Sequence, residues 1–316
     1  MALARRLCLL AALLWQVGHT TAETSLQSGF VDVPGGPVWY EIAGDGAGVP
    51  LLTLHGGPGG TSCGSQLLYP LANERPVIRY DQLGSGRSGR PSDTSLWQRD
   101  RFVEALHTLR QELGLERLHL HGHSWGGALA AYYVLQEGAE GIVSLTLSSP
   151  LISTPLWMRD ADALRATLPR EVQDTLDRHE GEGSTDHEDY VAATEVFYSQ
   201  FVTRGAAVEE TRCEDAPRNA LIYLQMWGPT EFHATGSLRD FDLTPRLAEI
   251  DVPTLFITGE YDEARPETIR AFAEAIPGAQ IEVLPQVGHA SLSRAPQRYR
   301  ELLASFLREA EARSVE

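Results

Sequence analysis

Ser124 stands midway between two glycines in residues 122–126, which read GHSWG. A strand-like run, 118–121, comes directly before this segment, and an alanine-rich run with helical character, 126–131, follows it. On a tight turn between a strand and a helix, flanking glycines leave no side chain to collide with the neighbouring backbone. The serine is then exposed at the positive end of the helix dipole. The pattern predicts a nucleophilic serine at position 124.

The same five-residue pattern occurs a second time, at residues 60–64, around Ser62. A chance match is expected in a chain with 29 glycines. Ser62 follows a glycine run with no strand directly before it, so the strand–turn–helix context is missing. We therefore interpret Ser62 as a loop hydroxyl.

A nucleophilic serine needs a base to take its proton and an acid to orient that base. Two later segments read as buried strands that end in suitable loops: 253–259, followed by Asp262, and 281–285, followed by His289. An acid after the serine and a histidine last is one of the chain orders in which such triads occur. We predict that Ser124, Asp262 and His289 form a catalytic triad. The alternatives are an ordinary turn aspartate and a surface histidine.

Backbone N–H groups must stabilise the negative charge that develops on the attacked carbonyl. The residue after the nucleophile, Trp125, supplies one donor. The second is expected from the glycine-rich loop 55–60, which follows the apolar run 51–54. Pro58 has no N–H to offer, and we predict Gly57 as the donor.

Several polar residues near these segments are interpreted as structural. His121 and His123 lie on the turn itself, where geometry prevents them from reaching the serine. Asp81 and Arg87 follow a strand-like run and are expected to hold a polar turn together. Neither phosphate-binding glycine motif has its required context, and no cysteine or histidine cluster has zinc spacing. We expect no cofactor and no metal.

Five motifs together resemble those of the proline iminopeptidases. They are HGGPG at 55–59, YDQLGSGRS at 80–88, GHSWGG at 122–127, GPTEF at 228–232 and GEYDE at 259–263. The likeness runs from about Pro34 to Leu307 and is closest to the branch that contains the tricorn-interacting aminopeptidase and related amino-acid amidases. The combination is far more specific than any single motif.

The resemblance implies an α/β-hydrolase fold, a mostly parallel sheet flanked by helices, with an inserted helical cap. It also implies release of an N-terminal residue from a peptide. The implied roles are nucleophile, acid and base for Ser124, Asp262 and His289, oxyanion donors for Gly57 and Trp125, and binding of the substrate's free amino group for Glu231 and Glu263.

A physical argument supports the pair of glutamates. An aminopeptidase must hold a cation at a fixed distance from the scissile carbonyl, and carboxylates in a partly dry pocket do this with charge-assisted hydrogen bonds. Glu263 is next to Asp262 in the chain. The alternatives are a surface Glu263 paired with Arg265, and a Glu231 that satisfies backbone donors of the cap.

The order of elements predicts one α/β core interrupted by an insertion. Strands are expected at 38–42, 51–54, 77–80, 118–121, 143–147, 254–258 and 281–284, with helices at 97–113 and 299–310. Between about 150 and 245 the alternation stops, and charged and aromatic residues take over. We predict core segments at 23–150 and 246–316 and a helical cap at 151–245, with most aromatics packed within the cap or onto the sheet.

The first 22 residues have the three parts of a secretory signal: Arg5-Arg6, an apolar run at 7–17, and small residues ending at Ala22. The expected location is secreted or periplasmic, or cytoplasmic if this segment is not a signal. Cys63 and Cys213 would then remain, and they form either a disulfide between cap and core or two buried thiols.

The net charge of −17 argues against nucleic acid or an anionic membrane as a partner. The favoured interpretation is a serine aminopeptidase that releases proline or another small apolar residue through an acyl-enzyme. Its substrates would be short peptides or amino-acid amides with a free N-terminus. The alternatives are an amino-acid amidase or aryl-amidase, an esterase, and an inactive binding module.

Overall fold

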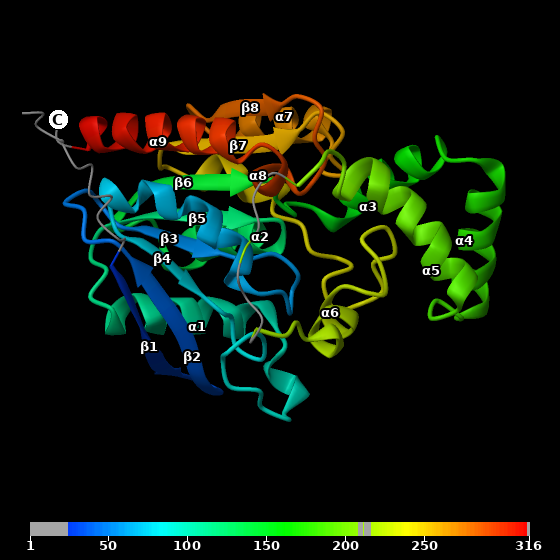
Figure 1. Cartoon of the computed structure of the whole chain (residues 1–316), viewed down its shortest axis with the longest axis horizontal. Coiled ribbons are helices and arrows are strands. Elements are labelled where there is room, and N and C mark those ends of the chain that lie inside the picture. The colour runs from blue at the N-terminus through cyan, green and yellow to red at the C-terminus, as the bar shows by residue number, and fades with distance from the viewer. Residues whose placement is uncertain (1–24, 208–210, 212–215, 315–316) are drawn as a thin grey trace, which may run out of the picture.

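The computed structural model describes residues 25–207, 211 and 216–314 (Figure 1). The predicted signal segment, 1–22, lies outside the described residues. Across the described part of the chain, no helix has both the length and the apolar character needed to cross a membrane.

Eight strands form one sheet in the order β1-β2-β4-β3-β5-β6-β7-β8. The strands are β1 (Leu26–Val33), β2 (Gly36–Ala43), β3 (Leu51–Leu54), β4 (Val77–Tyr80), β5 (Leu118–His123), β6 (Ile142–Ser148), β7 (Thr254–Gly259) and β8 (Gln280–Leu284). The pairs β1–β2 and β2–β4 are antiparallel, and the remaining neighbours are parallel. The carboxyl ends of β3 to β8 therefore point to one edge, where loops can gather functional groups.

Helices cover both faces of this sheet (Figure 1). They are α1 (Arg99–Glu112), α2 (Trp125–Glu137), α3 (Thr154–Arg165), α4 (Arg170–Glu182), α5 (Glu188–Phe197), α6 (Ala220–Met226), α7 (Pro266–Ala275), α8 (Ser291–Arg294) and α9 (Pro296–Arg313). Short helical turns add η1 (Ser62–Asn73), η2 (Thr94–Leu96), η3 (Tyr198–Val202) and η4 (Thr244–Glu249). The apolar residues of α1, α2 and α7 pack with one face of the central strands, and those of α9 and η1 pack with the other.

The central strands are buried on both faces, and apolar residues dominate β3, β6 and β7. All seven predicted strands are present within a residue or two of their predicted limits. The first strand, β1, was not predicted from the sequence. It is an edge strand with a mostly exposed face, and Phe30 remains 60% exposed, so its hydrophobic signal is weak.

Between β6 and β7 the chain leaves the sheet and forms α3 to α6. We call residues 151–245 the inserted segment. In Figure 1 its helices lie beside the edge of the sheet at which the parallel strands end. It has a core of its own, in which Tyr190, Phe197, Phe201 and Phe232 pack together. Trp157 and Trp227 instead join the main core, so the expected division of the aromatics is observed.

Cys63 is a disulfide-bonded cysteine. Cys213, the other half of the predicted bridge, lies outside the described residues. Cys63 Sγ is 3.6 Å from the hydroxyl oxygen of Thr211, two residues before Cys213 in the chain.

Candidate active site

Ser124 is the single residue between β5 and α2, and its backbone has a positive φ of 56°. A side chain on Gly122 would place its Cβ 2.1 Å from the carbonyl oxygen of Gly126. A side chain on Gly126 would bring its Cβ within 2.2 Å of the Leu54 oxygen at the end of β3. Both distances are far below van der Waals contact, so only glycine fits on either side of this turn. The strand–turn–helix geometry expected around Ser124 is present, and we call residues 122–126 the elbow.

Ser62 has a different setting, at the start of η1. Its Oγ and its backbone N–H both donate to Asp81 Oδ1 at 2.8 Å, and Arg79 donates to its Oγ at 3.2 Å. Asp81 Oδ2 accepts the backbone N–H of Arg87 at 2.9 Å, so this aspartate holds the turn together. Ser62 is thus a buried structural residue without an elbow.

Asp262 lies in the loop after β7 and is 1% exposed. Its oxygens accept five hydrogen bonds, from the hydroxyls of Ser149 (2.5 Å) and Thr258 (3.0 Å), the N–H groups of Gly259 (3.2 Å) and Ala264 (2.8 Å), and Nδ1 of His289 (2.9 Å). Burial opposes ionisation of this carboxyl. The positive imidazole of His289 and the hydrogen bonds outweigh burial, and the pKa of Asp262 lies below its ordinary value.

His289 lies in the loop after β8, where its backbone N–H donates to the Phe201 oxygen at 2.8 Å. Because Nδ1 bonds Asp262, Nε2 is the nitrogen left to accept a proton. Burial lowers the pKa of His289, but the attraction of Asp262, the hydrogen bond to it and the charge of Glu231 raise it further, and the net shift is upward.

The loop that carries His289 lies directly against the elbow. His123 Nε2 is 3.1 Å from the His289 carbonyl oxygen, and the centres of the two rings are 4.7 Å apart. His121 points to the other side of the sheet, where its Nε2 is 2.7 Å from the Tyr299 hydroxyl. The imidazoles of His121 and His123 are both engaged in structural contacts.

The glycine-rich loop after β3 also lies against the elbow. A Cβ on Gly56 would be 3.1 Å from the Cβ of Ser124, and one on Gly57, whose φ is +121°, would be 2.6 Å from the Gly60 nitrogen. The loop is therefore too compact for larger residues. Within the described residues, the backbone N–H groups of Gly57 and Trp125 donate to no protein acceptor.

Glu263 is 1% exposed, and neither of its carboxylate oxygens has a hydrogen-bond partner among the described residues. Its Oε1 is 3.9 Å from His289 Nδ1. Burial and repulsion from Glu231 and Asp262 raise the pKa of Glu263 well above its ordinary value. Arg265 pairs with Glu267 at 3.6 Å, so the alternative of a surface Glu263–Arg265 pair is wrong.

Glu231 comes from the inserted segment and is partly exposed. Its backbone is fixed on two sides: its N–H donates to the Tyr198 hydroxyl at 3.2 Å, and its carbonyl accepts the Trp157 indole N–H at 2.9 Å. Burial raises the pKa of Glu231, although His289 and the nearby Tyr223 hydroxyl oppose this shift. Its carboxylate and that of Glu263 repel each other across the site.

Comparison with known proteins identifies the family to which this chain belongs. Residues 49–296 match a family model described as the alpha/beta hydrolase fold. The chain is 45% identical over 284 residues to a proline iminopeptidase from Heyndrickxia coagulans, covering 88% of this chain and 98% of that protein. A proline iminopeptidase from Levilactobacillus brevis is 36% identical, with 85% of this chain and 92% of that protein covered. The chain belongs to the proline iminopeptidase family of α/β hydrolases.

A solved structure agrees with this assignment. The crystal structure of a proline iminopeptidase from Mycobacterium smegmatis superposes with a TM-score of 0.81 at 33% identity and covers 91% of this chain and 100% of that one. The predicted fold class and the resemblance to proline iminopeptidases are confirmed. The protein is a serine hydrolase of the prolyl aminopeptidase type.

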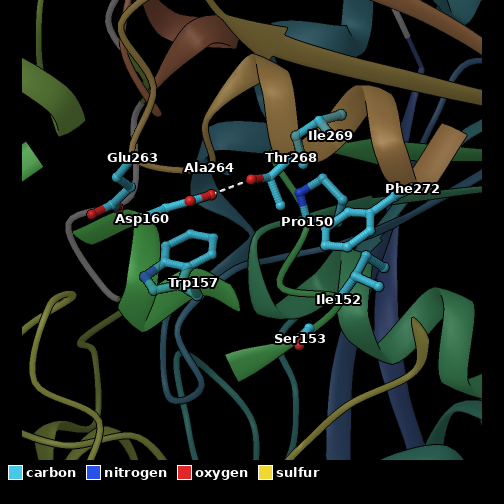
Figure 2. A pocket seen from close by; sticks show the side chains of 10 residues that line it. All are labelled: Pro150, Ile152, Ser153, Trp157, Asp160, Glu263, Ala264, Thr268, Ile269 and Phe272. Carbon is cyan, nitrogen blue, oxygen red and sulfur yellow. Dashed lines mark hydrogen bonds between the residues drawn. The ribbon is translucent and has the colours of Figure 1, made fainter. Parts of the chain in front are cut away.

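A small cavity lies next to Glu263 in this member of the proline iminopeptidase family (Figure 2). It has a volume of about 10 Å³ and is enclosed by α3, the start of α7 and the loop after β6. Asp160 and Thr268 form a hydrogen bond across it. A cavity of this size holds about one water molecule and is too small for an amino-acid residue.

One group in the described part of the chain has the composition of a metal site: His179, His187 and Asp189, whose ligand atoms lie within 4.8 Å of one another. Three of its four ring nitrogens already have hydrogen-bond partners. The Arg178 guanidinium donates to His179 Nε2 at 3.0 Å, His179 Nδ1 is 2.7 Å from the Ser184 hydroxyl, and His187 Nδ1 accepts the Asp189 N–H at 3.1 Å. A cation bound through His179 would have to displace Arg178 or Ser184, and the serine mechanism requires no metal.

The structure thus brings together the seven residues singled out in the sequence around one edge of the sheet. Sequence reasoning missed Ser149, which donates the shortest hydrogen bond to Asp262, and Gln82, whose side chain bonds both His55 and Trp125. Ser149 directly follows β6, 113 positions before the acid, and a serine there gives no motif.

Proposed function

We propose that this protein removes an N-terminal proline, or another small apolar residue, from short peptides. The observation that carries the proposal is the carboxyl group of Glu263, which is buried without a hydrogen-bond partner 3.9 Å from His289 Nδ1. A buried carboxyl group without a partner is costly, and a bound ammonium group would supply the missing charge.

In the proposed reaction, Ser124 Oγ attacks the carbonyl carbon of the N-terminal residue while His289 Nε2 takes its proton. The oxyanion that forms accepts hydrogen bonds from the N–H groups of Gly57 and Trp125. Asp262 holds the imidazole and stabilises its positive charge. His289 then protonates the leaving nitrogen, the C–N bond breaks, and the N-terminal residue remains as an ester on Ser124.

A water molecule completes the cycle. His289 takes one of its protons as its oxygen attacks the ester, and returns that proton to Ser124 Oγ when the C–O bond breaks. The products are the free amino acid and the shortened peptide. No redox step or external group is required.

The carboxylates of Glu231 and Glu263 bind the substrate's amino group in this proposal. Burial and repulsion from Glu231 and Asp262 raise the pKa of Glu263 in the free enzyme, and a bound ammonium or iminium group would favour its ionised form. Because the two glutamates come from the inserted segment and the β7 loop, the inserted segment acts as a cap that completes the site. This division makes 23–150 and 246–316 the core and 151–245 the cap.

An amino-acid amidase or aryl-amidase would use the same groups and differs only in the leaving group. An esterase for uncharged acyl chains is disfavoured, because such a substrate would leave Glu263 buried and unpaired. An inactive binding module has no need for the five hydrogen bonds that keep Asp262 ionised.

A panel of substrates tests the proposal. Wild-type enzyme is given prolyl and alanyl 4-nitroanilides, their N-acetyl forms and 4-nitrophenyl acetate. We expect the free-amine anilides to have the highest kcat/KM. Equal turnover of acetylated and free anilides would reject amine recognition and favour a general amidase or esterase.

We also propose that residues 1–22 are removed during export. The charged, apolar and small-residue parts of this segment support the proposal. N-terminal sequencing of the protein from the natural host tests it. A chain that begins at Glu23 is expected, and retention of residues 1–22 in the cell interior would contradict export.

A further inference from the structure

Gln82 connects the two halves of the proposed oxyanion hole. It lies in the turn after β4 and is 1% exposed. Its side-chain Nε2 donates to the backbone oxygen of His55 at 2.9 Å, and its Oε1 accepts the indole N–H of Trp125 at 3.0 Å. His55 opens the loop that carries Gly57. One carboxamide therefore joins the loop after β3 to the first residue of α2.

The partners fix the orientation of this carboxamide. An indole N–H can only donate and a backbone carbonyl can only accept, so the amide oxygen and nitrogen cannot exchange places. The backbone N–H of Gln82 adds a third bond, to Nε2 of His55 at 3.0 Å. His55 accepts this bond as a neutral ring, and burial lowers its pKa accordingly. Its Nδ1 lies 2.8 Å from the Gly56 oxygen and carries the proton.

We propose that Gln82 is a positioning residue that holds the N–H groups of Gly57 and Trp125 at the separation the oxyanion requires. These donors come from two different loops, and stabilisation of the oxyanion depends on both being within hydrogen-bond distance of one oxygen. Gln82 itself does not contact the substrate. The inference rests on the proposed function only in taking Ser124 as the nucleophile, and the substrate's amino group plays no part in it.

Two substitutions of Gln82 separate the contribution of its hydrogen bonds to activity from that of its volume. Gln82→Met keeps the length of the side chain and removes both side-chain bonds. Gln82→Glu keeps the acceptor for Trp125 and places a second acceptor against the His55 oxygen. Loss of a whole oxyanion donor costs about 10²–10³ in kcat, so misplacement should lower kcat by about 10- to 100-fold, with KM changed less than about twofold.

Ser88→Ala is the matched control. Ser88 lies in the same turn and is buried, and its Oγ accepts the Trp39 N–H at 2.8 Å. The variant loses two buried hydrogen bonds of this turn, the one from the Trp39 N–H and the one to the Asp81 carbonyl, but none that reaches His55 or Trp125. We expect a lower Tm and a kcat close to that of the wild type.

Phenylboronic acid gives a readout that a general loss of structure would not reproduce. Ser124 Oγ forms a bond to boron, its proton passes to His289, and the tetrahedral anion directs an oxygen to the oxyanion donors. In both Gln82 variants its Ki should rise by the same factor as kcat/KM falls, for prolyl 4-nitroanilide and for 4-nitrophenyl acetate. Wild-type kcat, or a lower kcat with unchanged boronate affinity, would overturn the proposal.

A double-mutant cycle of Gln82→Met with Trp125→Phe provides a second test, and Gln82→Glu serves by its own kcat and Ki if Gln82→Met does not fold. The phenylalanine removes the indole N–H, whose partner is Gln82. We expect Gln82→Met and Trp125→Phe together to lose less than the product of their separate losses, because each alone already removes this bond. Independent losses would overturn the coupling. Phenylboronic acid and 4-nitrophenyl acetate carry no amino group, so they test Gln82 independently of amine recognition. Failure of the proposed function would instead appear as wild-type enzyme that shows no preference for substrates with a free amino group.

Discussion

Two regions of the site shift the pKa of a buried carboxyl group in opposite directions. We call them the strand-edge side, which holds Ser124, Asp262 and His289, and the cap-facing side, which holds Glu263 and Glu231. Asp262 and Glu263 are consecutive residues, and each is 1% exposed. Asp262 accepts five hydrogen bonds and keeps a lowered pKa. Glu263 has no hydrogen-bond partner among the described residues and has a raised pKa. Burial alone therefore does not set the charge of a carboxyl group, and the donors around it do.

The difference follows from what each side must do. The donors to Asp262 are side chains and backbone N–H groups of the protein itself, so they favour the ionised acid with or without a substrate. In the proposed reaction, the substrate's amino group supplies the hydrogen-bond partner that Glu263 lacks, and binding is then selective for a cation.

The largest expected effect is on the strand-edge side. Ser124→Ala should lower kcat on the order of 10⁶-fold, by comparison with other serine hydrolases. Steady-state kinetics on prolyl 4-nitroanilide measures this loss. Ser62→Ala is the control, because it removes a buried hydrogen bond to Asp81 and should reduce stability by about 1 kcal/mol while activity is retained. An inactive Ser62→Ala with an active Ser124→Ala would reverse the assignment.

Asp262→Asn should lower kcat by about 10⁴-fold, because an amide cannot stabilise the imidazolium and favours the wrong tautomer of His289. The NH₂ group of asparagine would also face the O–H and N–H donors that bond Asp262. A donor facing donors cannot form these hydrogen bonds, so Tm should fall. Pre-steady-state kinetics locates the loss in the chemical step. A variant within tenfold of wild-type kcat would show that the acid lies elsewhere.

Glu263→Gln should affect stability in the opposite way to Asp262→Asn. The raised pKa means that folded Glu263 keeps its proton while the unfolded chain loses it, so its contribution to stability is lost as pH rises above about 4.5 towards the folded pKa. Glutamine has no such titration. The Tm of Glu263→Gln relative to wild type should therefore increase between pH 5 and pH 8, as measured by calorimetry.

A Tm difference that stays constant over this pH range would contradict the raised pKa. Glu267→Gln is a matched control at an exposed glutamate four residues further along, and it should show no such pH dependence.

The smallest expected effect on activity concerns the disulfide of Cys63, which we propose joins the core to the inserted segment. Cys63 follows the glycine loop of the core, and its proposed partner, Cys213, belongs to the inserted segment. Thiol titration of denatured, unreduced mature protein should find no free thiol at these positions. Two free thiols would reject the bridge, and the kinetic constants should change little on mild reduction.

Much of the site could be predicted from the sequence because its residues follow strands. Parallel strands bring their carboxyl ends to one edge, so the order of Ser124, Asp262 and His289 along the chain is enough to predict that they meet. The glycines of the elbow carry a steric requirement that can be recognised without coordinates. Strands β3, β6 and β7 are predictable because burial on both faces makes them rich in apolar residues.

The remaining features depend on contacts between residues far apart in the chain. The hydrogen bond from Ser149 to Asp262 and the bridge made by Gln82 require the folded arrangement of several loops. The sequence suggested a role for Glu263 but left a surface ion pair with Arg265 equally open, because a residue's burial in a loop leaves no periodic signal. Strand β1 was missed since its outer face is exposed.

The central claim is the proposal that the carboxylates of Glu231 and Glu263 select a free amino group. The most direct measurement is the ratio of kcat/KM for prolyl 4-nitroanilide to that for its N-acetyl form, in wild type and in Glu231→Gln and Glu263→Gln. A charge-assisted hydrogen bond contributes roughly 1.5 to 3 kcal/mol, so each variant should lose about 10- to 100-fold on the free-amine substrate and little on the acetylated one. The double variant should lose less than the product of the two, because both groups hold one cation. A wild-type ratio near one, or a ratio that is unchanged in both variants, would contradict the account.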